Sequence, residues 1–233
     1  MVHSPFFIER VNIMEWTFER IWHFVQGFIP AALMTIQVTL LGILFGVALG
    51  IFFALLRISK NPLINAPARI YIFIIRGTPL LLQLFIVYFG LVRIVSIDRI
   101  PSAIIALGVH NGAYIAEIFR GAIQSVDRGQ REAGISLGMT SLQVMKRIIL
   151  PQAFKRAIPP LGNQFIIALK DSSLASAIAV PELLLHARQM ASSNYLMMEM
   201  LTIAAVFYLL MTSALTFVAN RIERRLQVSD HRV

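Results

Sequence analysis

Four ionisable side chains lie within otherwise apolar stretches of the sequence: Arg76, Glu117, Lys170 and Asp171. A charge in the hydrocarbon region of a bilayer costs roughly 2.5–3.5 kcal/mol on insertion scales, so such residues are candidates for a functional role. In a purely structural alternative, Arg76 pairs with Glu117. Lys170 then pairs with Asp171 or a lipid phosphate, and the charges only hold helices together. Polar or helix-breaking residues near the four are expected to line a cavity: Gly77, Thr78, Pro79, Gln83, Tyr88, His110, Asn111, Tyr114, Asn163, Gln164, Ser172 and Ser173.

The stretches that position these side chains are apolar enough to cross a membrane. Of the 233 residues, 57% are hydrophobic and 14% are charged, against roughly 45–50% and about 25% in soluble domains. A spanning helix needs about 20 mostly apolar residues. Five stretches qualify: Ala31–Leu56, Ile70–Val92, Ser102–Phe119, Ala157–Ala179 and Met200–Asn220. We therefore expect an all-α integral membrane protein with five transmembrane helices.

Composition excludes several classes of function. The net charge of +9 could indicate a nucleic-acid partner, but a mean hydropathy of +0.72 assigns the basic residues to membrane flanks instead. The absence of cysteine excludes disulfides, cysteine-ligated metals and thiol nucleophiles. The histidines lack metal spacing, and neither a nucleophile elbow nor paired carboxylates occur. We expect neither an enzyme nor a metal or cofactor bound to this chain.

Basic residues set the expected orientation. Five spans put the termini on opposite sides, and fourteen Lys and Arg fall in the segments on one side against five on the other. The positive-inside rule then places the amino terminus outside and the carboxyl terminus inside. Residues 1–29 are expected to form an interfacial segment without a cleaved signal peptide, residues 30–225 the transmembrane domain, and residues 226–233 a cytoplasmic tail. Helically spaced apolar residues indicate a short helix in the first segment: Trp16, Phe18, Ile21, Trp22, Val25 and Phe28.

The longest inner segment contains a loop over about residues 129–151 that is predicted to hold two short helices. The first runs from about Arg131 and ends at Gly138, where glycine permits a left-handed backbone. The second is capped by Thr140, which has capping-box spacing to Gln143, and it ends before Pro151. Apolar and basic side chains alternate on this loop, which suits either a docking surface for a soluble partner or an ordinary amphipathic loop.

Three glycines in the first span, Gly42, Gly46 and Gly50, recur every fourth residue. This small-xxx-small spacing permits close helix contact. The contact is expected within one subunit, with a dimer seam as the alternative.

The loop resembles a known transporter motif. Glu132-Ala133, Gly138 and Ile149-Leu150-Pro151 resemble the "EAA…G…I-LP" loop of permease subunits of ATP-binding-cassette (ABC) importers, with Gly134 in place of the second alanine. Four further motifs, in order, are similar to polar amino-acid permeases of the histidine, glutamine and arginine type: Arg76–Gln83, Gly112–Gly121, Pro159–Asn163 and Lys170–Leu174. The resemblance covers about residues 30–225.

The resemblance implies a type I ABC importer fold in the bacterial cytoplasmic membrane. It also implies a second permease subunit, identical or homologous, two ATPase subunits that carry ATP and Mg²⁺, and an extracytoplasmic solute-binding protein. No Gly-x-x-x-x-Gly-Lys-Ser/Thr phosphate loop occurs in this chain, so we expect the motor to be a separate polypeptide. The residues that would couple to the ATPase are Arg131, Glu132, Ala133, Gly134, Leu137, Gly138 and Met139.

An amino-acid substrate presents a carboxylate and an ammonium group, so its site should offer one cation and one anion. Arg76 would bind the carboxylate and Asp171 the ammonium group, while a break at Gly77–Pro79 would expose backbone groups. The expected substrate-binding set is Arg76, Thr78, Gln83, Tyr88, Asn111, Glu117, Asn163, Asp171 and Ser172. The transported amino acid stays open, although Glu117 favours a cationic one. A channel or carrier without a motor is the alternative function.

Overall fold

The computed structural model describes residues 18–59, 61–91 and 95–227, which form helices joined by short turns and contain no strand. In chain order the elements are α1 (Phe18–Arg57), α2 (Pro62–Arg76), α3 (Leu80–Phe85), η1 (Ile86–Gly90), α4 (Arg99–Gln124), α5 (Arg128–Ser136), α6 (Ser141–Val144), η3 (Met145–Ile149), α7 (Leu150–Asp171), η4 (Ser172–Ile178), α8 (Leu183–Asn194) and α9 (Met197–Gln227).

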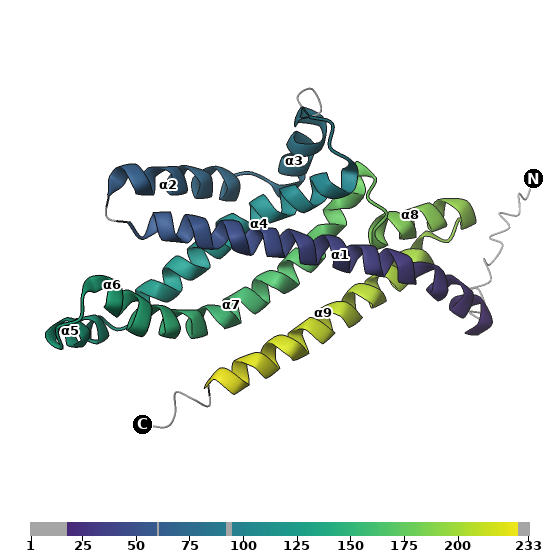
Figure 1. Cartoon of the computed structure of the whole chain (residues 1–233). Helices are drawn as coiled ribbons and strands as arrows, with labels where there is room; N and C mark the ends of the chain where they lie inside the picture. The colour runs from purple at the N-terminus through teal and green to yellow at the C-terminus, as the bar shows by residue number, and fades with distance from the viewer. Residues whose placement is uncertain (1–17, 60, 92–94, 228–233) are drawn as a thin grey trace, which may run out of the picture.

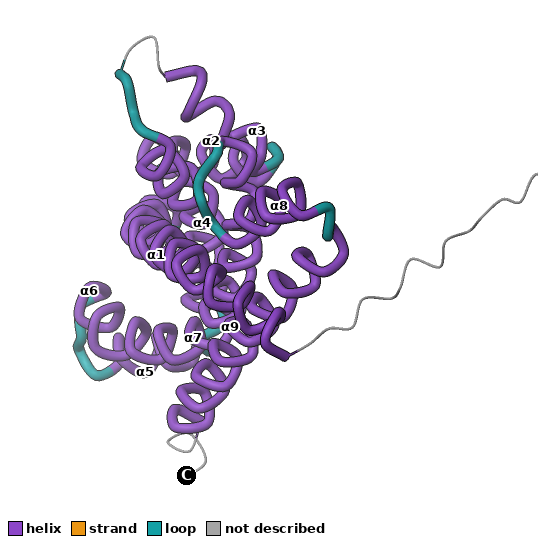
Figure 2. The backbone as a smooth tube through the Cα atoms, turned by 90° about the vertical axis from the view of Figure 1, so that its right-hand side faces the viewer, coloured by secondary structure: helices purple, strands orange, loops and turns teal. Residues whose placement is uncertain are grey.

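The long helices α1, α4, α7 and α9 form an elongated bundle, with α5 and α6 at one end and α8 near the other (Figure 1). α1 begins near the α8 end, and α9 runs toward the end that carries α5 and α6. Seen along the bundle, α1 and α4 are neighbours, with α2 and α3 to one side and α9 to the other (Figure 2). The predicted all-helical class is confirmed.

Close contact between α1 and α4 depends on small residues. A Cβ atom on Gly50 would lie 2.4 Å from Cγ2 of Ile115, and one on Gly46 would lie 3.1 Å from the carbonyl oxygen of Gly108. At Gly42 the nearest atom would be Cβ of Leu107, at 3.0 Å. The glycine repeat therefore packs helices within one chain, as its spacing predicts.

Three described helices are long and apolar enough to cross a membrane, namely Phe24–Arg57, Arg99–Gln124 and Met197–Leu226. The pair Pro62–Arg76 and Leu80–Gly90 makes a fourth if it is one bent span. α7, with the 3₁₀-helical η4, occupies the fourth predicted span but is not among these helices. Its hydropathy is lowered by the charged pairs near its start and at its end and by the prolines and amides between them, namely Gln152, Lys155, Arg156, Pro159, Pro160, Asn163, Gln164, Lys170 and Asp171. The five-span count stays a prediction.

Residues 18–29 continue directly into the first span, because α1 is one helix of 40 residues. No boundary separates them from the rest of α1, although Pro30 lies inside the helix. Phe28 is fully buried against Phe207 and His186, with ring centroids 5.9 and 4.7 Å away. This packing holds the start of α1 against α8 and α9. Residues 1–17, including Trp16, and the tail residues 228–233 lie outside the described residues.

Candidate functional site

The second predicted span is broken, as its sequence indicates. α2 and the helical stretch from Leu80 to Gly90 are bent by 105° across Gly77, Thr78 and Pro79. Proline disfavours helical backbone in the residue before it, which ends α2 here. The Thr78 hydroxyl donates to the carbonyl oxygen of Ile74 at 2.9 Å and so terminates the helix locally. The break is typical of discontinuous helices in transporters.

Gln83 stabilises this break. Its Nε2 donates to the carbonyl oxygen of Ile75 and to Oγ1 of Thr78, both at 2.8 Å. Its Oε1 lies 3.1 Å from Nδ1 of His110 on α4. Because the side chain is buried and its amide is already bonded, Gln83 holds α2, α3 and α4 together. It is not positioned as a free ligand for substrate.

A charged cavity opens beside the end of α2. Its volume is about 510 Å³, and no residue of α7 is among those that line it. It brings together the two sequence-predicted charges Arg76 and Glu117. Its lining residues are Arg57, Arg69, Ile72, Phe73, Arg76, Gly77 and Glu117.

Glu117 is held by arginines other than Arg76. Nε and Nη2 of Arg120 donate to the Glu117 carboxylate at 2.7–3.0 Å, and Nε of Arg57 lies 3.8 Å from Oε1. The alternative in which Arg76 pairs with Glu117 is thus not seen: among described residues, Glu117 forms salt bridges only with Arg57 and Arg120. The Arg76 guanidinium instead lies 5.1 Å from the centre of the Tyr114 ring.

Arg57 and Arg69 also line this cavity, although the sequence did not single them out. Both lie outside the long apolar stretches or at their edge, so they were counted only among the basic residues that set the membrane orientation. Nη1 of Arg57 and Nε of Arg69 both donate to Oδ1 of Asn65, at 3.2 and 2.7 Å. Asn65 is buried, so it fixes both guanidinium groups at the cavity wall. The wall facing Arg76 is therefore strongly basic.

Two further predicted ligands form hydrogen bonds within the protein instead. Asn111, which is fully buried on α4, donates to the carbonyl oxygen of Leu107 at 2.8 Å and accepts from Nε2 of Gln164 at 2.8 Å. The hydroxyl of Ser172, also fully buried, donates to the carbonyl oxygen of Leu169 at 2.7 Å. Asn111 thus joins α4 to α7, and Ser172 helps turn the chain into η4.

The other predicted ligands lie away from this cavity. Asp171 is half-buried at the end of α7, and no salt bridge joins it to Lys170 in the described part of the chain. Asn163 is exposed on α7. Tyr88 is half-buried in the π-helical turn η1, with its ring 4.8 Å from that of Phe89. The structure therefore groups Arg76 and Glu117, places Thr78 at the adjoining break, and leaves these three outside.

The loop at the α5 end of the bundle contains the two predicted helices. Asp127 caps α5 by accepting from the backbone N–H of Gly129 at 2.6 Å, so α5 begins at Arg128 rather than near Arg131. Gly138 has the expected left-handed backbone, with φ of 81°. The capping box between Thr140 and Gln143 is confirmed.

The second helix of this loop does not end before Pro151, so that prediction is wrong. α6 passes through the π-helical turn η3 directly into α7. Pro151 follows the π-helical turn η3 and lies in the first turn of α7, so its missing N–H falls where the regular i→i−4 bonding already changes. The loop and α7 are consequently one helical path.

The coupling residues divide into an exposed set and a packed set. Arg131, Glu132, Ala133 and Leu137 are exposed, Leu137 to 82%. Gly134 is buried, and a Cβ there would lie 2.8 Å from Cγ2 of Val144. Met139 is half-buried in the hydrophobic cluster between the loop and α7. Exposed residues can contact a partner, while the packed ones fix α5 on α6 and η3.

Glu182 is a buried acid that the sequence reasoning did not identify. It caps α8, accepting from the N–H groups of Leu184 and Leu185 at 2.9 and 2.8 Å. Tyr208 on α9 donates to the same carboxylate at 2.6 Å, and Leu183 N–H donates to Oγ1 of Thr35 on α1 at 3.2 Å. An acid directly before the apolar run of α8 is an N-cap signal, but its partner on α9 is 26 residues away.

Three features together define the membrane subunit of a transporter. They are the long apolar helices, the span broken beside a charged cavity and the helical loop at one end of the bundle. The chain belongs to the family described as binding-protein-dependent transport system inner membrane component, whose model matches residues 46–228. It is accordingly a permease of the cytoplasmic membrane with several membrane-crossing helices.

Several relatives are similar over most of their length. The glutamine transport system permease protein GlnP of Escherichia coli (strain K12) is 37% identical over 218 residues, which cover 92% of this chain and all of GlnP. The L-cystine transport system permease protein TcyB of Bacillus subtilis is 44% identical over 194 residues, covering 82% of this chain and 83% of TcyB.

Solved structures confirm the type I importer fold. A chain from the crystal structure of an amino acid ABC transporter with histidines is 39% identical, covers 91% of this chain and all of its own length, and superposes with a TM-score of 0.86. A chain of the inward-facing MetNI methionine ABC transporter is 21% identical, with 90% and 99% coverage and a TM-score of 0.70. This second likeness concerns the fold alone.

Proposed function

We propose that this permease carries a polar amino acid across the membrane as one subunit of an ABC importer. The similar glutamine and L-cystine permeases support an amino-acid substrate. The observation that carries the proposal is Arg76, a cation at the break between α2 and α3, in a cavity that also contains Glu117.

Arg76 is suited to bind the carboxylate that all free amino acids share. In the described part of the chain it has no ion-pair partner, and its guanidinium faces the Tyr114 ring at 5.1 Å. A guanidinium fork binds a carboxylate through two parallel hydrogen bonds.

Asp171 is the better candidate for the ammonium group, because the Glu117 oxygens already accept from Arg120. The segment after Asp171 packs against the segment after the break: Ala175 and Ile178 of η4 share a hydrophobic cluster with Leu80 and Leu84 of α3. A substrate between the break and the end of α7 would meet Arg76 on one side and Asp171 on the other. Glu117 would then balance the basic cavity wall.

The motor and the delivery protein are other polypeptides in this proposal, and ATP with Mg²⁺ binds to the motor. With the amino terminus outside and the carboxyl terminus inside, α5 and α6 face the cytoplasm. The exposed face of Arg131, Glu132, Ala133 and Leu137 would contact one of two ATPase subunits. A second permease, identical or homologous, completes the pathway, and a solute-binding protein supplies substrate from outside. Closure of the ATPases would then switch the paired permeases between inward- and outward-open states.

Uptake into liposomes that contain the whole transporter tests this proposal. Glutamine, arginine, histidine and cystine are each offered as radiolabelled substrate, with and without ATP. A hydrogen bond to a charged group is worth roughly 1.5–3 kcal/mol, so R76Q should raise KM at least tenfold for the accepted substrate. R99Q, which removes an exposed arginine at the start of α4, is the matched control. An unchanged KM in folded R76Q would remove Arg76 from the site, and uptake without ATP would favour the carrier alternative.

A further inference from the structure

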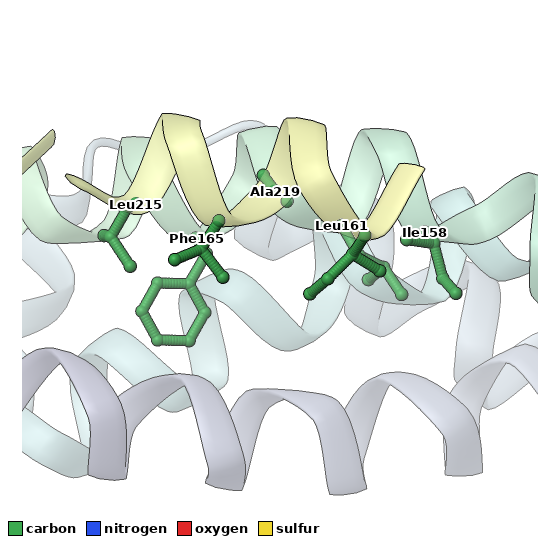
Figure 3. Close-up of a pocket in the computed structure, with 8 residues that line it drawn as sticks. Ile158, Leu161, Phe165, Leu215 and Ala219 are labelled. Atoms are coloured by element: carbon green, nitrogen blue, oxygen red, sulfur yellow. The ribbon is translucent and has the colours of Figure 1, made fainter. Parts of the chain in front are cut away.

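A groove between α7 and α9 has no role in the proposed transport mechanism. Its volume is about 410 Å³, and its walls are formed by Ile158, Leu161, Gly162, Phe165, Leu215, Val218, Ala219 and Ile222. Figure 3 shows Phe165 and Leu161 of α7 below α9, with Leu215 toward one end of the groove and Ile158 toward the other. None of the lining residues has a polar side chain, so the groove suits a hydrocarbon ligand.

The groove, together with the turn of α9 that follows it, covers about half the thickness of the hydrocarbon core. α7 and α9 are in close contact at Gly162, where a Cβ would lie 3.0 Å from Cβ of Ala219. From Leu215 to Arg225 the rise along α9 is about 15 Å, against about 30 Å for the hydrocarbon core. A chain in the groove would therefore extend from one headgroup region to the bilayer centre. That headgroup region is on the side of α5 and α6, toward which α9 runs (Figure 1).

Basic side chains border the groove at this end. Arg225 is two helical turns beyond Val218 on α9, and Lys155 is two turns before Gly162 on the antiparallel α7. Together with Arg221 they make three cations at this end of the groove, where Glu223 is the one nearby carboxylate in the sequence of α9. Arg221 and Arg225 are exposed and have no ion-pair partner among the described residues. Arg224 is two residues from Ile222 and thus projects from the opposite side of α9.

We propose that this groove binds an anionic phospholipid. One acyl chain lies between α7 and α9 as far as Phe165, and the phosphate contacts Arg221 and Arg225 at the membrane surface. The apolar walls and the length of the groove suit an acyl chain, and the basic residues at its end suit a phosphate. Basic pockets between membrane helices select anionic headgroups. The lipid fills a gap beside α9. Only 11% of the most apolar, membrane-crossing stretch of α9 is buried in this chain. The proposal depends on membrane embedding and not on the transported substrate.

Native mass spectrometry of the full-length permease, purified with its partner subunits, tests this assignment. The probe is an equimolar mixture of phosphatidylglycerol and phosphatidylcholine with identical acyl chains. Each basic residue near a membrane surface contributes roughly fivefold to anionic-lipid binding. The wild-type chain should therefore retain phosphatidylglycerol at least fivefold over phosphatidylcholine, and the double variant R221Q/R225Q should reduce that ratio to near one.

Two controls separate the site from general charge effects. R224Q removes one cation from the other side of α9 and should keep most of the preference. V218F fills the groove from a side chain that is 51% exposed and should reduce adducts of both lipids. Equal loss in R224Q and R225Q, or unchanged adducts in V218F, would overturn the proposal. So would rapid disulfide formation between two copies of V218C, because it would show that a second copy covers the groove; the chain contains no other cysteine.

Discussion

Removing the buried carboxylate of Glu182 should destabilise the permease by about 2–3 kcal/mol. Glu182 is 0% exposed and accepts three hydrogen bonds, from Leu184, Leu185 and Tyr208. Loss of an N-cap costs about 0.5–2 kcal/mol, and a buried donor left unpaired costs about 1–3 kcal/mol. The release of a buried charge offsets part of this sum in E182L. E182Q should cost less, because the amide oxygen can still accept from the α8 backbone.

Thermal denaturation of the detergent-purified chain measures this effect. For a chain of this size, 1 kcal/mol corresponds to a shift of roughly 2–4 °C in Tm. E182L should therefore lower Tm by about 4–12 °C, Y208F by less, and E182Q least. E132Q, which changes an exposed acid on α5, is the matched control. A Tm for E182L equal to that of E132Q would refute the reasoning, because the Glu182 hydrogen bonds would then contribute nothing to stability.

Two glycine substitutions test other parts of the fold. G50A should lower Tm, because its Cβ would meet Ile115 at 2.4 Å and overpacking costs about 1–3 kcal/mol. G121A should be neutral or stabilising, because a Cβ at this position in the last turns of α4 would have nothing within 4 Å. Similar Tm values for the two would contradict the α1–α4 packing. G138A places a Cβ at φ of 81°, which costs about 1–2 kcal/mol. It should reduce ATP hydrolysis stimulated by the loaded binding protein while substrate binding persists, and full stimulation would argue against a coupling role for Gly138.

Local patterns predicted much of this fold. Glycine spacing in the first span predicted a close helix contact within the chain, and the structure shows that α4 is the partner, where Ile115 meets Gly50. The capping box at Thr140 follows from two residues three positions apart. The break at Gly77–Pro79 follows from the conformational limits of its own residues. Each of these features depends on neighbours in sequence or on a single periodic surface.

Partners distant in sequence were not predictable from such patterns. Glu117 is three residues from Arg120, which helical spacing could have revealed, but its second partner Arg57 lies on α1. Asn111 and Gln164 are 53 residues apart, and their hydrogen bond depends on how α4 meets α7. Polarity therefore indicated which side chains avoid lipid, whereas only tertiary packing decides which of them are left free for a ligand.

The direct continuation of the loop into α7 has a mechanical consequence. From Leu150 to Asp171, α7 is a helix of 22 residues, about 33 Å long. Its first turn is packed on the coupling loop through the cluster that contains Val144, Ile149 and Ala153. Its last residue is the acid proposed to meet the substrate. α7 is continuous between these points although it contains Pro159 and Pro160. Displacement of the loop would therefore shift or rotate Asp171, so that the force of the motor could reach the substrate through one helix.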